Sequence, residues 1–559
     1  MPWEERLRVE LAFVYGGEVG GRLADALTAL VRQSHSMARG AGSRPADPDG
    51  AILITYGDQV ARDSERPLAA LRGFLSDHVR GFISGVHVLP FYPWSSDDGF
   101  AVKDFFAVDE ALGTWEDVRA LGGEFDLMVD AVFNHASAEG EWFHKFRAAE
   151  TGFEEFFVTV EDDAGLSAVV RPRALPLLTP FETARGTRLV WTTFSADQVD
   201  LNLRDPRVMK ALCEALLFYL EQGARLVRLD AIGFVWKESG TTCIHLPQAH
   251  ALVRAWRALA DGAAPGARIV TETNVPHADN ISYFGDGGNE AHMVYNFALP
   301  PLVLHTLGTG DASALTRWAA DLHTPSRDTA FFNFLASHDG IGLNPVRGIL
   351  QDSEIAELIE MAKAAGGFVS MKSLPGGGET PYELNVSFFD VLATGVGEDT
   401  ALRRFTVAHA IAFALAGVPG VYFHSLFGSR GDVEGAHTSG IPRRINREKL
   451  LRTALEADLA DSTSRRRRIL DHLAGLLRMR RANPAFALSS PQAVRDFGPG
   501  VFALERGAGS GRVVCLHEIS GRAATVEVAG CWRGLDDGKT FVGAVPLAPY
   551  GIRWLGALT

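Results

Sequence analysis

Residues 225–234 read RLVRLDAIGF, a short apolar run that leads directly into the carboxylate of Asp230. A helix is predicted just before this run, because Asp205 can cap a first turn, Pro206 suits the first helical position and Gly223 can end the helix. A helix followed by a short buried strand is typical of a βαβ unit, in which successive strands run parallel.

The same pattern recurs along the chain. Seven further apolar runs, most of them rich in β-branched or aromatic residues, alternate with helix-like stretches; they are found at 51–56, 85–90, 127–133, 268–272, 293–297, 330–335 and 418–423. Eight such repeats predict an α/β fold, a (β/α)8 TIM barrel, whose functional residues sit at the carboxyl ends of the strands.

Two predicted connections, from Asp130 to Asp230 and from Asp339 to Val418, are far too long for one βα unit. We expect an insertion in each, on the face that carries the C-terminal strand ends. After about Ala482 the pattern changes to short alternating strands with turn signals, which predicts a small antiparallel β-domain. The predicted division is an N-terminal helical extension (1–50, with a Gly- and Pro-containing linker near 39–50), a barrel or domain A (51–135, 204–339 and 401–481), domain B (136–203), domain B′ (340–400) and a C-terminal β-domain (482–559).

Charge and cysteine content restrict the class of protein. The 54 Lys and Arg against 68 Asp and Glu give a formal net charge of −14, which disfavours binding to nucleic acid or an anionic membrane. The four cysteines are far apart, so we expect no disulfide framework, no metal site and no cofactor. The charged start, MPWEERLRVE, lacks the apolar core of a signal peptide. We therefore expect a cytoplasmic protein that acts on small molecules, with homo-oligomerisation left open.

Carboxylates stand at the ends of three predicted strands: Asp230, Glu272 and Asp339. Strand alternation puts Arg228 and Asp230 on the same side, toward the barrel interior. A buried guanidinium keeps a neighbouring carboxylate ionised, as a nucleophile requires. One nucleophilic and one acid/base carboxyl make the arrangement for retaining glycosyl transfer. Any one of the three taken alone could equally cap a helix.

Four segments then match, in order, the conserved regions of a known superfamily: DAVFNH (130–135), RLDAIGF (228–234), TETN (271–274) and SHD (337–339). The chain resembles the α-amylase superfamily of glycoside hydrolases and transglycosylases, and within it the sucrose-phosphorylase-like subgroup. The resemblance covers roughly residues 50–559 and implies a TIM barrel with a carbohydrate substrate.

The resemblance also implies roles for individual residues. Asp230 would be the nucleophile, Glu272 the general acid/base and Asp339 the transition-state stabiliser. The glucosyl subsite would be formed by Asp97, Phe100, His135, Arg228, His338 and Arg443. Taken without the resemblance, His135 could merely order its loop and Phe100 could be a core residue.

The acceptor side departs from sucrose phosphorylases proper. Ser337 stands where most hydrolases of the superfamily carry Asn, which favours phosphorolysis, but Phe234 replaces a Tyr and Asn274 a His of the sucrose phosphorylases. Four segments resemble glucosylglycerate phosphorylases instead: 236–250, 271–277, 420–432 and 443–450. Those enzymes release glycerate, a small anion, and Arg430, Arg443 and Arg444 lie on loops predicted to reach the mouth of the barrel, where arginine could hold an anion.

The resemblance therefore implies a retaining glycoside phosphorylase that moves an α-glucosyl unit from 2-O-α-D-glucosyl-D-glycerate to phosphate by double displacement. The products would be α-D-glucose 1-phosphate and D-glycerate. Sucrose 6′-phosphate phosphorylase, sucrose phosphorylase, glucosylglycerol phosphorylase and a sucrose-type glucosyltransferase or hydrolase remain alternatives. The three arginines could also simply pair with acidic surface residues. A non-catalytic amylase-like protein is disfavoured, because the three carboxylates are all present.

Overall fold

The computed structural model describes residues 1–37, 47, 49–374 and 378–558. The linker predicted near 39–50 lies mostly outside the described residues. Among the helices of the described ranges, none is both long and apolar enough to cross a membrane.

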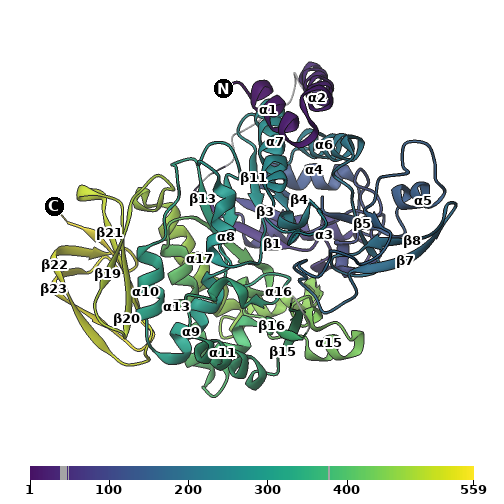
Figure 1. The fold of residues 1–559 in the computed structure, drawn as a ribbon. Helices are drawn as coiled ribbons and strands as arrows, with labels where there is room; N and C mark the ends of the chain where they lie inside the picture. The colour runs from purple at the N-terminus through teal and green to yellow at the C-terminus, as the bar shows by residue number, and fades with distance from the viewer. Residues whose placement is uncertain (38–46, 48, 375–377, 559) are drawn as a thin grey trace.

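Eight parallel strands close into a barrel (Figure 1), which confirms the predicted TIM fold. All eight predicted runs form its strands: β1 Ile52–Thr55, β3 Gly85–Val88, β4 Asp126–Ala131, β10 Leu226–Leu229, β11 Arg268–Thr271, β12 Met293–Tyr295, β13 Ala330–Asn333 and β17 Val418–Tyr422. The register places Arg228 opposite Asp130 on the neighbouring strand β4. Side-chain alternation along β10 then directs Arg228 and Asp230 to one side, as predicted.

Helices surround the barrel, and the one that precedes β10 shows how the sequence places them. Helix α6 (Pro206–Glu221) begins where the Asp205 carboxylate accepts a hydrogen bond of 2.8 Å from the Arg207 N–H. It ends before Gly223, whose φ of +100° is favourable only for glycine. The other helices of this layer are α3 Pro67–His78, α4 Trp115–Glu124, α7 Pro247–Ala263, α9 Leu299–Thr309, α10 Ser313–Ala320, α13 Glu398–Ala414 and α17 Arg465–Arg481.

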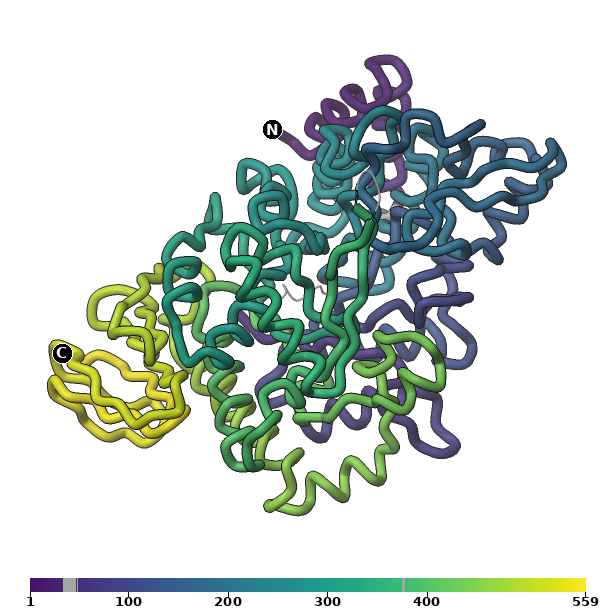
Figure 2. Tube along the Cα trace, turned by 60° about the horizontal axis from the view of Figure 1, so that its bottom comes forward, coloured from purple at the N-terminus to yellow at the C-terminus, as the bar shows by residue number. Residues whose placement is uncertain are grey.

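Two long segments leave the carboxyl ends of the barrel strands. Between β4 and β10 lie β5 His135–Ser137, α5 Glu141–Arg147, β6 Thr159–Val160, β7 Leu178–Thr183, β8 Gly186–Trp191 and β9 Gln198–Asp200. Between β13 and β17 lie β14 Ile341–Gly342, α11 Asp352–Ala364, β15 Phe368–Ser373, β16 Glu379–Asn385 and α12 Phe388–Ala393. Figure 2 shows the paired β15 and β16 as a long green ladder that runs toward the blue segment between β4 and β10. The borders of domains B and B′ given above stay predictions.

Short elements after β17 cover the rim of the barrel: α14 Phe423–Leu426, α15 Val433–Ser439, the 3-10 helix η5 Pro442–Asn446, β18 Leu450–Leu451, which pairs with β2 Val60–Ala61, and α16 Arg452–Ala460. The chain then ends in a six-stranded sheet of order β19-β20-β21-β24-β22-β23. Its strands are β19 Gln492–Asp496, β20 Val501–Arg506, β21 Val513–Glu518, β22 Ala524–Gly534, β23 Thr540–Leu547 and β24 Ile552–Ala557, all of them antiparallel.

The first two helices, α1 Trp3–Tyr15 and α2 Gly17–Met37, pack on the outside of the barrel against α7 and α6. The Trp3 ring lies so close to Gly262 of α7 that a Cβ there would come within 2.4 Å of it. The Arg254 guanidinium of α7 binds the Glu10 carboxylate of α1 at 2.8 Å. The N-terminal helices therefore brace α7, which follows directly on the loop after β10.

A buried lysine fastens the segment between β4 and β10 to the barrel. The Lys237 ammonium lies 2.6 Å from an Asp200 carboxylate oxygen and donates a 2.6 Å hydrogen bond to the Asn134 side-chain oxygen. Lys237 and Asp200 are 7 % and 0 % exposed. Because Thr193 also donates two hydrogen bonds to Asp200, this ion pair ties together the ends of β4, β8 and β10.

We expect Lys237→Met to lower the free energy of unfolding by about 3–5 kcal/mol, because it leaves the buried Asp200 carboxylate without its cation. The measurement is thermal and urea unfolding of the full chain. Lys363→Met is the control: Lys363 is an exposed helix lysine paired with Glu360 at 2.9 Å, and its loss should cost below about 1 kcal/mol. Equal stability of the two variants would contradict the assignment.

Candidate active site

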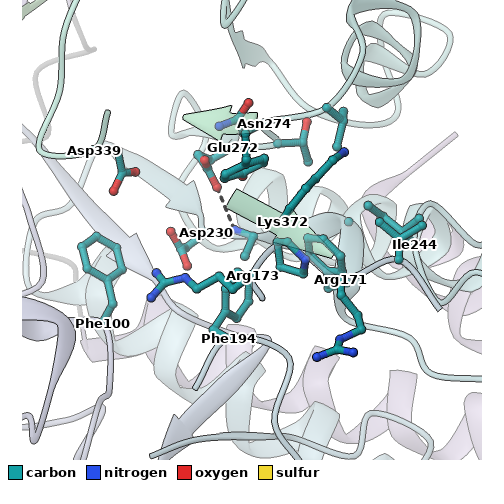
Figure 3. A pocket seen from close by; sticks show the side chains of 18 of the residues that line it. Phe100, Arg171, Arg173, Phe194, Asp230, Ile244, Glu272, Asn274, Asp339 and Lys372 are labelled. Carbon is teal, nitrogen blue, oxygen red and sulfur yellow. Dashed lines mark hydrogen bonds between the residues drawn. The ribbon is translucent and has the colours of Figure 1, made fainter. Parts of the chain in front are cut away.

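The carboxyl ends of the barrel strands and the two long segments enclose a cavity (Figure 3). Ten of the thirteen residues predicted for the site line it: Asp97, Phe100, His135, Asp230, Phe234, Glu272, Asn274, His338, Asp339 and Arg443. They come from loops and strand ends that are up to 346 residues apart in the chain, from position 97 to position 443. The barrel closure brings them together, as expected for this fold.

Arg228 lies beneath the cavity at the centre of the barrel. Its guanidinium donates a 2.5 Å hydrogen bond to Asp130, lies 3.0 Å from an Asp230 oxygen and lies 3.9 Å from a Glu272 oxygen. The ring of Tyr295 faces it with its centroid 5.3 Å away. Arg228 therefore positions the two carboxyls and does not itself line the cavity.

Asp230 and Glu272 share one environment. Burial raises the pKa of the Glu272 carboxyl, and burial raises the pKa of Asp230 as well, with Glu272 adding to that rise. The Arg228 guanidinium opposes both shifts and is nearer to Asp230. Two neighbouring buried carboxyls hold one proton between them. Because Arg228 is nearer to Asp230, we expect this proton on Glu272. The sequence predicts an Asp230 carboxylate kept ionised by Arg228 alone, whereas in the structure its charge also depends on the proton shared with Glu272.

Asp339 is held as an anion by arginines. Arg443 lies 2.6 Å from it and Arg447 lies 3.5 Å from the same oxygen. Although burial raises the pKa of Asp339, these guanidinium groups, Arg443 foremost, and the neighbouring His338 bring it well below its ordinary value. Arg443 also donates two hydrogen bonds, of 3.0 and 2.7 Å, to Glu383. Arg443 is thus fully occupied by carboxylates.

Asp97 is a further carboxylate of the predicted glucosyl subsite and lines the same cavity as Asp339. Arg173 donates a 2.9 Å hydrogen bond to Asp97, and the nearby guanidinium groups, Arg173 foremost, hold the pKa of Asp97 well below its ordinary value although burial raises it. The Phe100 ring stacks on the His338 ring with centroids 4.8 Å apart. The Nε2 atom of His135 lies 2.9 Å from the Phe100 carbonyl oxygen. His135 therefore both orders this loop and reaches the cavity wall.

A second group of residues, two of them cationic, lines the far side of the cavity. Figure 3 shows Arg171, Lys372 and Ile244 on the side away from Phe100 and Asp339. Arg171 donates a hydrogen bond to the Leu175 carbonyl. Within the described part of the chain, neither Arg171 nor Lys372 forms an ion pair with a carboxylate. Two cations thus remain available at this wall.

The two positions that depart from sucrose phosphorylases, Phe234 and Asn274, both line the cavity. The Phe234 ring meets the Phe194 ring edge to face, with centroids 5.7 Å apart. Asn274 packs against Gly342, where a Cβ would come within 2.3 Å of the Asn274 side-chain oxygen. Gly342 therefore leaves the space that the Asn274 side chain fills.

Arg430 and Arg444 do not line the cavity, which corrects their predicted place at the acceptor. Arg430 binds Asp390 at 2.7 Å and lies over the Phe389 ring, with its side chain 56 % exposed. Arg444 binds Asp98 at 2.8 Å. Both arginines pair with carboxylates outside the cavity, the alternative that the acidic composition left open.

Four basic residues of the cavity wall were not predicted from the sequence: Arg171, Arg173, His245 and Lys372. Arg171, Arg173 and Lys372 belong to the two long segments, whose folding back onto the barrel depends on contacts distant in sequence. His245 lies within the 236–250 segment that resembles glucosylglycerate phosphorylases, and this was the only signal that could have indicated it.

Comparisons with known proteins agree with this geometry. The alpha amylase catalytic domain family matches residues 81–341. A glucosylglycerate phosphorylase from Allomeiothermus silvanus is 50 % identical over 508 residues, 90 % of each chain, and one from Escherichia coli is 42 % identical over 547 residues, 97 % of this chain and 98 % of its own. The crystal structure of sucrose 6F-phosphate phosphorylase from Thermoanaerobacter thermosaccharolyticum superposes with a TM-score of 0.75 at 22 % identity, covering 93 % of this chain and 100 % of that one, and shares the fold. The chain therefore belongs to the glucosylglycerate phosphorylase family, in the sucrose-phosphorylase-like subgroup of the α-amylase superfamily.

Proposed function

We propose that this chain is a retaining phosphorylase that transfers the α-glucosyl unit of 2-O-α-D-glucosyl-D-glycerate to inorganic phosphate, releasing D-glycerate and α-D-glucose 1-phosphate. The observation that carries this proposal is the 50 % identity to a glucosylglycerate phosphorylase over 90 % of both chains. The three carboxyls around one cavity supply the chemistry, and the cations of the far wall supply a reason for an anionic acceptor.

In the first half-reaction, the Asp230 carboxylate attacks the anomeric carbon while the Glu272 carboxyl protonates the departing glycerate oxygen. The raised pKa of Glu272 favours its protonated form, which the general acid requires. Asp339, ionised beside Arg443, stabilises the positive charge that develops on the sugar ring. The product is a β-glucosyl-enzyme joined to Asp230, and glycerate leaves from the far side of the cavity.

In the second half-reaction, phosphate occupies the place of glycerate. Glu272, now deprotonated, acts as the base for the incoming phosphate oxygen, which attacks the anomeric carbon from the face that glycerate left. The bond to Asp230 breaks, and two inversions give net retention. Asp230 returns to its carboxylate form, and Glu272 has regained its proton.

Recognition of the anionic partner would rest on Arg171 and Lys372. Arg173, Arg443 and Arg447 are already bound to Asp97, Asp339 and Glu383. Burial and the nearby Arg347 lower the pKa of Lys372, so both disfavour its charged form. A bound anion would offset this effect. A carboxylate or phosphate between these two cations would form charge-assisted hydrogen bonds.

The acceptor assay separates the alternatives. With α-D-glucose 1-phosphate as the donor, we expect phosphate release to be fastest with D-glycerate, compared with glycerol, fructose and fructose 6-phosphate. Preference for fructose 6-phosphate would indicate a sucrose 6′-phosphate phosphorylase, preference for fructose a sucrose phosphorylase, and preference for glycerol a glucosylglycerol phosphorylase. Product formation from a glucoside without phosphate would indicate a hydrolase.

We expect Arg171→Ala and Lys372→Ala each to reduce kcat/KM for glycerate by roughly 10- to 100-fold, because each removes a hydrogen bond between charged groups. Activity with glycerol should fall much less. Arg430→Ala is the matched control, since Arg430 lies outside the cavity, and it should leave both activities unchanged. Parallel losses for glycerate and glycerol would remove the support for anion recognition.

We expect kcat/KM for glucosylglycerate to fall as pH rises through the pKa of Glu272, because the leaving oxygen then loses its proton donor. α-Glucosyl fluoride needs little protonation of its leaving group, so kcat/KM for fluoride release, which reports the first half-reaction alone, should be kept in Glu272→Gln while glucosylglycerate cleavage is lost. Asp230→Asn should abolish cleavage of both donors. If Glu272→Gln impairs both donors equally, Glu272 is not the acid.

A further inference from the structure

We infer that His245 is a specificity-determining residue whose Nε2–H donates a hydrogen bond to an oxygen of the bound anion, either the glycerate carboxylate or phosphate. This inference rests on the proposed function and assigns one more ligand to its acceptor side. His245 takes no part in the two half-reactions described above.

His245 lies on the cavity wall in the loop that follows β10, next to Ile244. Its N–H donates a 3.0 Å hydrogen bond to the Gly233 carbonyl, and its φ is +55°, in the left-handed region that side chains seldom adopt. Cys243, two residues earlier, has φ +53°. Residues in this strained backbone conformation persist only where contacts with the rest of the protein hold them there. In this loop the conformation places the imidazole of His245 on the cavity wall.

The hydrogen bond on the other side of the ring fixes the tautomer. His245 Nδ1 lies 2.8 Å from the Tyr283 hydroxyl. Tyr283 is 0 % exposed, and burial raises the pKa of its phenol, so it keeps its proton. Within the described residues that proton has no acceptor other than Nδ1, so Tyr283 donates to Nδ1.

The proton of the neutral imidazole must then be on Nε2. Burial lowers the pKa of His245 to about 4, with His250 lowering it further and Asp279 opposing, so the ring is neutral near pH 7. Among the described residues Nε2 has no partner, and it is not sealed in the interior. His245 therefore offers the cavity one N–H donor, and its chain neighbour Ile244 lies on the same side of the cavity as the free cations Arg171 and Lys372 (Figure 3).

Tyr283 is itself held firmly, which makes it a positioning residue. Its ring stacks on His250 with centroids 4.5 Å apart. His250 Nδ1 lies 2.6 Å from a Glu290 oxygen, and Arg254 of α7 lies 3.5 Å from the other Glu290 oxygen. Through Arg254 this network continues to Glu10 of the N-terminal helix α1. The N-terminal helices thereby support the residue that orients His245.

The experiment measures how one glucosyl-enzyme partitions between acceptors. Enzyme is supplied with α-glucosyl fluoride and mixtures of D-glycerate, phosphate and glycerol, and the products are quantified. Because all products arise from the same intermediate, the ratio of anionic to neutral products is independent of the first half-reaction. His245→Asn is the main variant, since asparagine tolerates the left-handed backbone but is too short to reach the anion.

We expect His245→Asn to lower the partition toward glycerate, phosphate or both, relative to glycerol, by roughly 10- to 100-fold. Tyr283→Phe leaves the loop backbone unchanged but frees the tautomer, so it should lower the same ratio by a smaller factor. Thr242→Ala, which changes an exposed residue of the same loop that does not line the cavity, is the matched control and should leave the ratio unchanged.

The outcomes are distinguishable. If the wild-type enzyme favours the anions and His245→Asn keeps the full anion-to-glycerol ratio, the inference on His245 is overturned and the proposed function stands. If the wild-type enzyme transfers to phosphate but not to glycerate, the proposed substrate is wrong, and a lowered phosphate ratio in His245→Asn still supports the inference. If the wild-type enzyme favours neither anion over glycerol, both are overturned.

Discussion

One buried guanidinium organises the centre of this enzyme. Arg228 lies in the barrel interior between Asp130 and the carboxyls of Asp230 and Glu272. His87 lies 2.8 Å from the other Asp130 oxygen, so polar groups of three neighbouring strands, β3, β4 and β10, meet at Asp130. A charge of this kind is tolerated away from water only with its partners in place. The position of the reacting carboxyls is therefore a consequence of how the barrel neutralises its own interior.

A second buried guanidinium extends this order to the loops. Arg447, 2 % exposed, donates to Asp98 at 2.7 Å and to the His338 carbonyl at 2.9 Å. It joins the loop after β3, the end of β13 and the segment after β17. Phe100 and His338, which stack on each other, are thereby fixed from both sides. The glucosyl half of the cavity is thus held in place by contacts within the protein itself.

The sequence was informative where structure is local and less so where it is not. Each barrel strand is a short apolar run, and a carboxylate directly after it stays at the cavity whatever the loops do, so Asp230 and Glu272 could be placed. Asp339 lies in the loop after β13 and was identified by its SHD segment. The acceptor wall is different, because Arg171 and Lys372 reach it only after long segments fold back over the barrel. Arg430 shows that a position soon after a barrel strand does not by itself place a side chain in the cavity. It follows β17 closely, but its ion pair with Asp390 holds it outside.

The unequal distribution of compensated charge has a consequence for ionic strength. On the glucosyl side the guanidinium groups of Arg228 and Arg447 are buried, that of Arg443 is partly buried, and all three are matched by carboxylates; dissolved ions screen such pairs weakly. On the acceptor side Arg171 and Lys372 remain uncompensated and accessible to the cavity. Dissolved anions therefore compete for the acceptor side of the cavity only. Binding of the glucosyl unit should depend little on ionic strength, whereas binding of the small anion should weaken as the salt concentration rises.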